Sequence, residues 1–394
     1  MRRMEESFLY VSQGKVYSKA ADKPPQLIES KFGQSIIDRA AQIQNRNAWK
    51  TQGSGARFMS GGMLWRQPES EMEIPIVVNA ISRGSQPGEF LYSLTTHEIG
   101  GVFCSRENGK DEQRLLHTAD FRVGQLNSNP SDHRIACVIR AKTDAHIAIM
   151  NENGTDLREV TQGDSLDVSP SWVPGSQDEV IFQSAGVARN EHGMSVGTSP
   201  SRIEKLSLTS GEITTLLEDE QRDFLSPRMD AAGNLYCISK PYQHPHPRFN
   251  PLRAALDLLL LPFRLLFALF QFINLFTMKY TGNTLVSSGG MRQKEMNMRH
   301  MLIMNNLAQA NRAPAKSLWG KSEWQIPRSW TLIKRSPSGE TQVLEEGVLT
   351  FDLMEDGALL LSDGAGIWSR QVDGSKKELA KAQFISQVLA FPEQ

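Results

Sequence analysis

The chain has 394 residues, of which 22% are charged and 39% are hydrophobic, as in ordinary globular proteins. A formal net charge of -1 provides no overall positive field, so a nucleic-acid partner is not expected. The length allows a closed repeat fold with a large core, which needs neither a metal nor a disulfide to hold it together.

The N-terminal segment contains two arginines followed directly by acidic and polar residues, without the apolar run of a secretory signal peptide. The three cysteines are Cys104, Cys137 and Cys237, and each lies far from the others in apolar, strand-like sequence. This pattern favours buried free thiols over a disulfide or a metal site. We therefore expect a cytoplasmic protein.

The first hairpin of the chain is predicted over Phe8–Ser30. A first insertion follows over residues 31–73, with a short helix expected at Ser35–Gln44. A glycine-rich stretch at Gly53–Gly62 follows no clear strand, so it does not match a nucleotide-binding fingerprint. The next hairpin is predicted over Gly101–His117.

Residues 132–184 contain the clearest repeat of the chain. Ile135, Cys137 and Ile139 alternate with polar residues, as a half-buried strand requires. A tight turn separates the next two strands, and Gly154 occupies its position for a positive φ. The period of about 40 residues is typical of propeller blades.

The sequences IAIMNENGTDLREVT (147–161) and SPSWVPGSQDEVIFQS (169–184) resemble the repeat of TolB-like β-propellers, a WD40-like fold. In that family a blade contains a Ser-Pro-x-Trp motif, an Asp-Gly turn and an apolar strand. The chain departs from the pattern at Gly175–Asp178, where GSQD replaces the Asp-Gly turn. The resemblance implies a fold that carries many unrelated functions.

Weaker copies of the hairpin extend this pattern along the chain. Counting all copies gives six, centred on Val16, Val102, Ile147, Ile203, Leu332 and Ile367. The C-terminal segment Phe384–Phe391 is expected to pair with the N-terminal strand and so close the ring from both chain ends. We predict an all-β protein: one six-bladed β-propeller over residues 1–394 with a helical insertion in one blade. Rings of five and of seven blades are the alternatives, because the degenerate repeats leave the count open.

A second, apolar insertion is predicted over residues 242–328, within a blade. On a helix, four polar residues of this insertion fall within about 40° of one another and form one narrow stripe. The polar stripe is Arg253, Asp257, Arg264 and Gln271. The opposite face is apolar and is predicted to contact a membrane or a partner through Leu256, Leu259, Leu260, Phe263, Leu266, Phe267, Phe270, Phe272 and Ile273.

Three interpretations of this apolar segment remain open: a helix lying in the plane of a membrane surface, a buried or oligomer-forming helix, and a spanning or re-entrant helix. Arg264 near the middle of the segment disfavours the spanning interpretation, because a charge in hydrocarbon is costly. A Met-rich, basic stretch at Met291–Lys316 follows and contains cations that suit anionic lipid headgroups. The alternative is an ordinary solvated helix that returns the chain to the ring.

No hydrolase elbow, zinc-protease motif or phosphate-binding loop is present in the sequence. His244 and His246 lack an evident third metal ligand, and the Pro-rich sequence around them favours a stiff linker. Weak candidates for a site on a propeller face are His97 with Glu98, and His117 with Asp120. Strand-end hydrogen bonding is expected for Asp164, Asp167 and Ser169, and packing between blades for Trp172.

The pattern as a whole favours a non-catalytic, protein-binding scaffold that is peripherally attached to a membrane through the amphipathic insertion. It implies an unidentified protein partner, a membrane surface, no cofactor and no metal, and leaves homo-oligomerisation open. The alternatives are a lactonase-like propeller hydrolase with a metal at the channel mouth, and a soluble oligomer assembled through the helix.

Overall fold

The computed structural model describes most of the chain outside the second insertion. The described residues are 7–20, 23–51, 76–96, 99–106, 109, 111–129, 131–141, 144–243, 326–354 and 356–391. The residues of the second insertion from 244 to 325 lie outside them, as do residues 52–73 of the first insertion.

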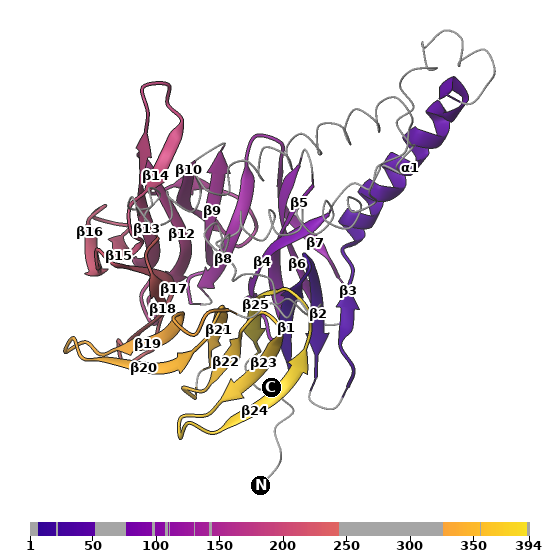
Figure 1. Cartoon of the computed structure of the whole chain (residues 1–394). Coiled ribbons are helices and arrows are strands. Elements are labelled where there is room, and N and C mark those ends of the chain that lie inside the picture. The colour runs from indigo at the N-terminus through magenta and orange to yellow at the C-terminus, as the bar shows by residue number, and fades with distance from the viewer. Residues whose placement is uncertain are drawn as a thin grey trace, which may run out of the picture. The chain divides into compact units, whose positions relative to one another are not determined.

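The described residues form six four-stranded antiparallel blades (Figure 1). The strands of each blade are given from the inner strand outward. Blade 1 contains β25 (Ile385–Ala390), β1 (Phe8–Ser12), β2 (Lys15–Lys19) and β3 (Gln26–Ile28). Blade 2 contains β4 (Val77–Arg83), β5 (Glu89–Thr95), β6 (Gly100–Arg106) and β7 (Gln113–Thr118), and blade 3 contains β8 (Arg122–Asn129), β9 (Arg134–Ala141), β10 (Asp144–Asn151) and β11 (Arg158–Glu159).

Blades 4 to 6 follow the same order. Blade 4 contains β12 (Ser165–Trp172), β13 (Glu179–Arg189), β15 (Arg202–Ser207) and β16 (Ile213–Leu217). Blade 5 contains β17 (Arg222–Met229), β18 (Leu235–Pro241), β19 (Thr331–Arg335) and β20 (Thr341–Glu346). Blade 6 contains β21 (Thr350–Leu353), β22 (Leu359–Ser362), β23 (Gly366–Arg370) and β24 (Lys376–Lys381). A short strand, β14 (Ser195–Thr198), extends β13 beyond blade 4.

The inner strands contact one another in a closed ring, from β4 through β8, β12, β17, β21 and β25 back to β4. Blades 3 and 4 are also joined by one parallel bridge, between Ala145 and Leu166. β1 pairs with β25 from Phe8 opposite Ala390 to Ser12 opposite Ile385, so strands from both chain ends share blade 1. The prediction of an all-β, six-bladed propeller is confirmed.

The Ser-Pro pairs of the repeat form bulges in the inner strands. In β12 the register shifts between Val168 and Ser171, and Ser169 has a φ of 55°. In β17 the shift lies between Leu225 and Arg228, and Ser226 has a φ of 52°. A bulge leaves residues without a partner in the ladder, which suits a proline that has no N–H to donate.

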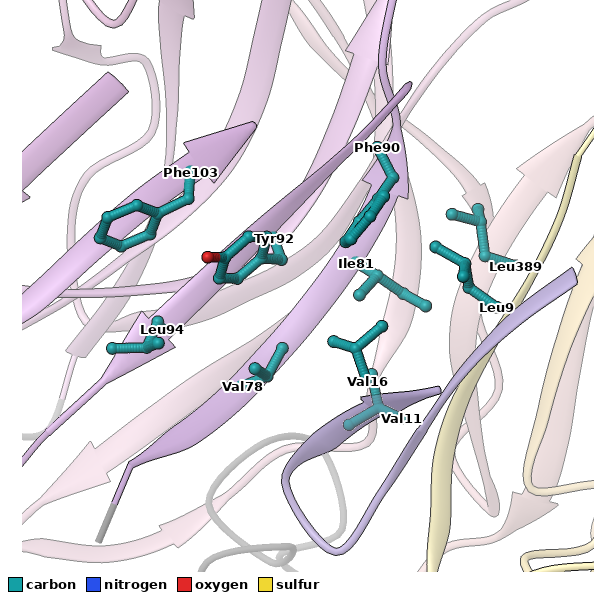
Figure 2. Packing of buried hydrophobic residues seen from close by; sticks show 10 residues of the cluster. All are labelled: Leu9, Val11, Val16, Val78, Ile81, Phe90, Tyr92, Leu94, Phe103 and Leu389. Atoms are coloured by element: carbon teal, nitrogen blue, oxygen red, sulfur yellow. The ribbon is translucent and has the colours of Figure 1, made fainter. Parts of the chain in front are cut away.

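Hydrophobic clusters fill the spaces between neighbouring blades. Figure 2 shows the cluster between blades 1 and 2, formed by Leu9, Val11, Val16, Val78, Ile81, Phe90, Tyr92, Leu94, Phe103 and Leu389. Phe90 and Phe103 are fully buried there. Burying one such side chain contributes about 1.5–3 kcal/mol, so the packing of many of them between blades stabilises the ring strongly.

The one helix of the described chain is α1 (Lys31–Thr51), which is longer than the predicted Ser35–Gln44. Ser30 caps it, because the Ser30 hydroxyl accepts a hydrogen bond from Gly33 N at 3.1 Å. Glu112 of blade 2 accepts two more from the backbone nitrogens of Lys31 and Phe32, at 2.9 and 2.8 Å. The early start of the helix therefore depends on a tertiary contact.

The antiparallel order gives the ring two distinct faces. One face carries every connection from a second to a third strand and every connection to the next blade; it includes Gly14, Ser201 and Tyr242, and we call it the insertion face. The other carries the turns between first and second strands and between third and fourth strands. It includes the turns at Gly175 and Gly374, and we call it the short-turn face.

Candidate functional site

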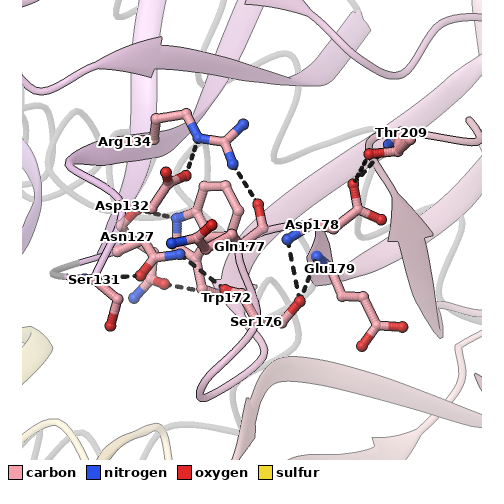
Figure 3. Close-up of polar contacts among 11 residues, drawn as sticks. Asn127, Ser131, Asp132, Arg134, Trp172, Ser176, Gln177, Asp178, Glu179 and Thr209 are labelled. Carbon is pink, nitrogen blue, oxygen red and sulfur yellow. Dashed lines mark hydrogen bonds and ion pairs between the residues drawn. The ribbon is translucent and has the colours of Figure 1, made fainter.

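The Ser-Pro-Ser-Trp motif has a structural role between blades 3 and 4. Trp172 is buried, its indole N–H donates to Asn127 O at 3.1 Å, and its backbone nitrogen donates to Asn127 Oδ1 at 2.8 Å (Figure 3). The Arg134 guanidinium lies 5.2 Å from the centre of the Trp172 ring. The predicted packing of Trp172 between blades is confirmed.

The GSQD sequence that replaces the usual Asp-Gly turn also forms a tight turn between two strands. Gly175 has a φ of 78°, and Ser176 N donates to Val173 O at 3.0 Å, which closes the turn. Asp178 then accepts hydrogen bonds from Ser207 Oγ at 2.6 Å and Thr209 N at 2.7 Å. These bonds hold the pKa of Asp178 below its ordinary value. The segment therefore joins two turns of blade 4.

The residues expected at strand ends are engaged within the fold, and Ser169 among them lies at the bulge of β12. Asp164 accepts a hydrogen bond from Arg189 Nε at 2.6 Å. Asp167 accepts hydrogen bonds from Ser165 Oγ at 2.9 Å and Ser184 Oγ at 2.8 Å. His146 Nδ1 lies 3.8 Å from Asp167 Oδ2, too far for a hydrogen bond. The hydroxyls of Ser165 and Ser184 therefore donate to the Asp167 carboxylate, and neither is positioned as a nucleophile activated by the His146 imidazole.

The histidine candidates do not assemble a site in the described residues. His117 packs edge-on against the Phe32 ring in the outer strand of blade 2, and Asp120 N bonds to Thr118 Oγ1. His97, Glu98, His244 and His246 lie outside the described residues. Among the residues that are described, no group of three or more His, Cys, Asp or Glu side chains is arranged to hold a metal ion.

A buried ion pair fixes the base of the second insertion on the insertion face. Asp223 and Lys240 are 1% and 5% exposed, and Lys240 Nζ lies 3.4 Å from Asp223 Oδ2. The ammonium also lies 5.0 Å from the centre of the Trp330 ring. Burial lowers the pKa of Lys240, and Asp223 opposes that effect. Lys240 precedes the insertion and Trp330 follows it, so this contact joins the points where the chain leaves and re-enters the blade.

A cavity of about 350 Å³ lies beside the point where the chain re-enters the ring. Ile326 and Trp368 provide apolar walls, and acidic side chains at Glu345, Glu346 and Asp363 contribute to the lining. Lys376 Nζ is 2.5 Å from Glu345 Oε2, so one of these charges is already paired. Arg328 also lines the cavity, so this recess on the insertion face carries three carboxylates and two cations.

The short-turn face has a different charge pattern at the centre of the ring. Arg83, the last residue of β4, reaches across to blades 1 and 6. Its Nη2 lies 2.7 Å from Asp352 Oδ2, and its Nε donates to Ala390 O at 2.8 Å. The Asp352 side chain is 9% exposed and that of Arg83 is 35% exposed. An ion pair thus connects three inner strands.

A second arginine, Arg228, lies close to this pair. It follows the Ser-Pro bulge of β17, and burial lowers the pKa of its guanidinium, with Asp352 opposing the shift and Arg83 adding to it. Its Nη1 donates to Pro227 O at 2.9 Å. We call Arg83, Arg228 and Asp352 the central arginine cluster. It carries two positive charges and one negative charge, so one positive charge remains.

Sequence reasoning missed this cluster, although a local signal exists. In β12 the residue after the Ser-Pro pair is Ser171, whereas in β17 the corresponding residue is Arg228. A charge in place of a small residue at an inner-strand bulge indicates a side chain near the ring centre. The predicted contact and polar-stripe residues of the second insertion all lie outside the described residues. No described helix is both long enough and apolar enough to span a membrane.

Comparison with known proteins supports the fold. No protein-family model and no curated sequence matches the chain. A structure of a nidogen/laminin complex superposes with a TM-score of 0.51 at 8% identity, covering 99% of each chain. TolB from Acinetobacter baumannii superposes with a TM-score of 0.50 at 6% identity, covering 99% of this chain and 67% of that one. The chain therefore has a six-bladed β-propeller fold similar to the propeller of TolB, as its repeats predict.

Proposed function

We propose that this propeller is a non-catalytic, protein-binding scaffold that attaches peripherally to the cytoplasmic surface of a membrane. In this proposal the second insertion contacts the lipid and the ring presents its other surfaces to a protein partner. The observation that carries the proposal is topological: the elaborations of the ring all connect to its insertion face.

Three segments depart from the minimal blade pattern. The first connects β3 to β4 and re-enters beside Gly14, whose carbonyl accepts a hydrogen bond from Val78 N at 2.8 Å. The second is the extension of β13 by β14, which projects at the top of Figure 1 and exposes Met194 and Val196. The third connects β18 to β19. The short-turn face has only brief turns, so the two faces are suited to different contacts.

The base of the third segment is held firmly. Besides the contact of Lys240 with Trp330, Tyr242 N donates to Gln221 O at 2.8 Å. The hydroxyl of Tyr242 also bonds to Thr198 O at the end of β14. Both ends of the third segment are therefore anchored in blade 5, which suits attachment of the ring through this segment.

The sequence of residues 250–280 supplies the chemistry for lipid contact. A broad apolar surface with a narrow polar stripe is typical of a helix lying in the interface plane of a membrane. The basic residues of 291–316 would add attraction to anionic headgroups, and that attraction is weakened by salt.

The test is co-sedimentation with vesicles of phosphatidylcholine and phosphatidylserine. We compare the whole chain with Phe270→Asp, which places a charge on the apolar surface, and with Gln271→Asp, which places the same charge on the neighbouring polar stripe. The proposal expects Phe270→Asp to lose binding and Gln271→Asp to retain it.

Two results would contradict the proposal. If neither the whole chain nor Gln271→Asp sediments with vesicles, and Phe270→Asp changes the oligomeric mass in solution, the insertion is an assembly interface. If both variants bind as the whole chain does, the attachment does not use the predicted apolar surface.

A further inference from the structure

The cavity at the junction of blades 5 and 6 has firmly held walls, and the scaffold proposed above does not account for it. Two segments of the insertion face line it: residues 345–348, where β20 ends, and residues 361–363, where β22 ends. Gly347 N donates to Trp330 O at 2.7 Å, and Ser362 Oγ donates to Gly366 O at 2.6 Å. The volume of about 350 Å³ falls within the range of about 300–1,000 Å³ that is usual for small-molecule sites.

One wall of the cavity is an indole ring whose position depends on a glycine. Trp368 is half-buried, and a Cβ placed on Gly366 would lie 2.7 Å from Cη2 and Cζ2 of its ring. The indole therefore occupies space that any side chain at position 366 would take. The face of an indole carries negative charge density and attracts organic cations.

The charged groups of the lining divide into a pair and three further groups. Lys376 Nζ is 2.5 Å from Glu345 Oε2, so these two charges compensate each other. The three further groups are Glu346, Asp363 and Arg328, and among the described residues none of them has an ion-pair partner. Asp363 Oδ1 accepts hydrogen bonds from two backbone nitrogens of its own turn, at 2.8 and 2.9 Å. The cavity therefore offers two carboxylates and one guanidinium to a ligand.

We propose that this cavity binds a small zwitterion that carries a primary ammonium group. The ammonium group is held by Glu346 and Asp363 beside the Trp368 ring, and the anionic group of the ligand pairs with Arg328. The mixed lining selects this class, because separated charges of both signs on the protein complement separated charges on the ligand. A simple anion would be repelled by the carboxylates, and an apolar ligand would leave desolvated charges without partners.

Two substitutions separate the two ends of the ligand. Glu346→Gln removes a negative charge facing the ammonium group, and Arg328→Gln removes the positive charge facing the anionic group. Each should weaken binding of the zwitterion roughly tenfold, the lower end of the range for charged hydrogen bonds, because both side chains are exposed. Arg328→Gln should leave binding of ethanolamine, which has no anionic group, unchanged.

The experiment measures thermal midpoints of the whole chain at constant ionic strength and increasing concentrations of leucine or glycerophosphoethanolamine. N-acetyl-leucine, which lacks the ammonium group, is the matched comparison. A ligand that binds the folded state raises the midpoint with concentration. The expected result is a rise with a zwitterion and none with N-acetyl-leucine. Glu346→Gln and Arg328→Gln should require about tenfold more ligand for the same rise.

A matched control and two probes sharpen the result. Glu340→Gln, which removes an exposed carboxylate from the turn between β19 and β20 on the short-turn face, should behave as the unaltered chain. A rise with leucine alone would support the proposal and identify a free amino acid as the source of the zwitterion. A rise with glycerophosphoethanolamine alone would support it and identify a lipid headgroup.

Three outcomes would overturn the inference. The first is no rise with either zwitterion, and the second is an equal rise with leucine and N-acetyl-leucine. The third is an unchanged response in folded Glu346→Gln and Arg328→Gln variants, which would place the binding elsewhere on the chain. No vesicle is present in this assay, so failure of the membrane proposal would leave its outcome unaffected.

Discussion

Gly154 offers the sharpest test of how neighbouring blades pack. The residue lies in the turn after β10, with a φ of 83°, and its nitrogen donates to Asn151 O at 2.9 Å. A Cβ placed on Gly154 would lie 2.2 Å from the carbonyl oxygen of Leu115 in blade 2 and 2.6 Å from its carbonyl carbon. Both atoms belong to the backbone of a paired strand, so they cannot move away at little cost.

Gly211 provides a matched control. It has a φ of 71°, and nothing lies within 4 Å of the position its Cβ would occupy. Gly211→Ala therefore carries only the conformational cost of a left-handed alanine, about 1–2 kcal/mol. Gly154→Ala carries that cost and a steric cost of about 1–3 kcal/mol, as for overpacking in a core. We expect a total loss of about 2–5 kcal/mol at Gly154.

The assay is equilibrium unfolding in urea at neutral pH, followed by tryptophan fluorescence. The dependence of the unfolding free energy on urea concentration is compared between the variants, to check that each exposes a similar surface when it unfolds. The reasoning is refuted if Gly154→Ala is no less stable than Gly211→Ala. That result would mean that the turn and Leu115 can separate freely, and that blades 2 and 3 are not in tight contact there.

Two further predictions concern the Ser-Pro-Ser-Trp region and its turn. Trp172→Ala should lower the free energy of unfolding by about 3–5 kcal/mol, because it empties a packed site between blades; a loss below 1 kcal/mol in urea unfolding would contradict that role. Asp178 has a folded-state pKa below its ordinary value, so its stabilising contribution is present above about pH 4 and is lost as pH falls through the folded-state pKa. The stability gap between the unaltered chain and Asp178→Asn should therefore shrink from pH 7 to pH 3, and a gap that stays constant would show that hydrogen bonds to the charged form are not its source.

The repeats predicted the ring because each blade repeats the same local pattern. The six hairpins fall in six different blades, since Val16, Val102 and Ile147 lie in β2, β6 and β10, and the remaining three lie in β15, β19 and β23. Alternating apolar residues and positive-φ turns are local properties, so they survive in degenerate copies. The extent of α1 was not predictable in this way, because its cap includes Glu112, about 80 residues further along the chain.

The central arginine cluster was hidden for a related reason. Arg83, Arg228 and Asp352 are single charges in strands that are far apart in sequence, and each alone resembles an ordinary exposed residue. Only the closure of the ring brings them together, with Arg83 bonded to Asp352 across 269 positions of the sequence. The ion pair of Asp223 and Lys240 at the base of the second insertion was missed for the same reason, because cross-strand partners are set by register.

The chain offers a matched pair of labelling positions to test its orientation at a membrane. Val196 lies in β14 on the insertion face, and Val372 lies in the turn between β23 and β24 on the short-turn face; they are 46% and 73% exposed. The native thiols are buried, and burial raises the pKa of Cys137 to about 12 and raises those of Cys104 and Cys237 as well. A thiol-reactive dye should therefore label only an introduced cysteine.

The most direct test of the account is quenching of this dye by spin-labelled lipids, in vesicles of phosphatidylcholine and phosphatidylserine. The account predicts strong quenching for Val196→Cys and little for Val372→Cys when the labelled chains are bound. Equal quenching at both positions, or stronger quenching at Val372→Cys, would contradict a propeller that faces the membrane with its insertion face.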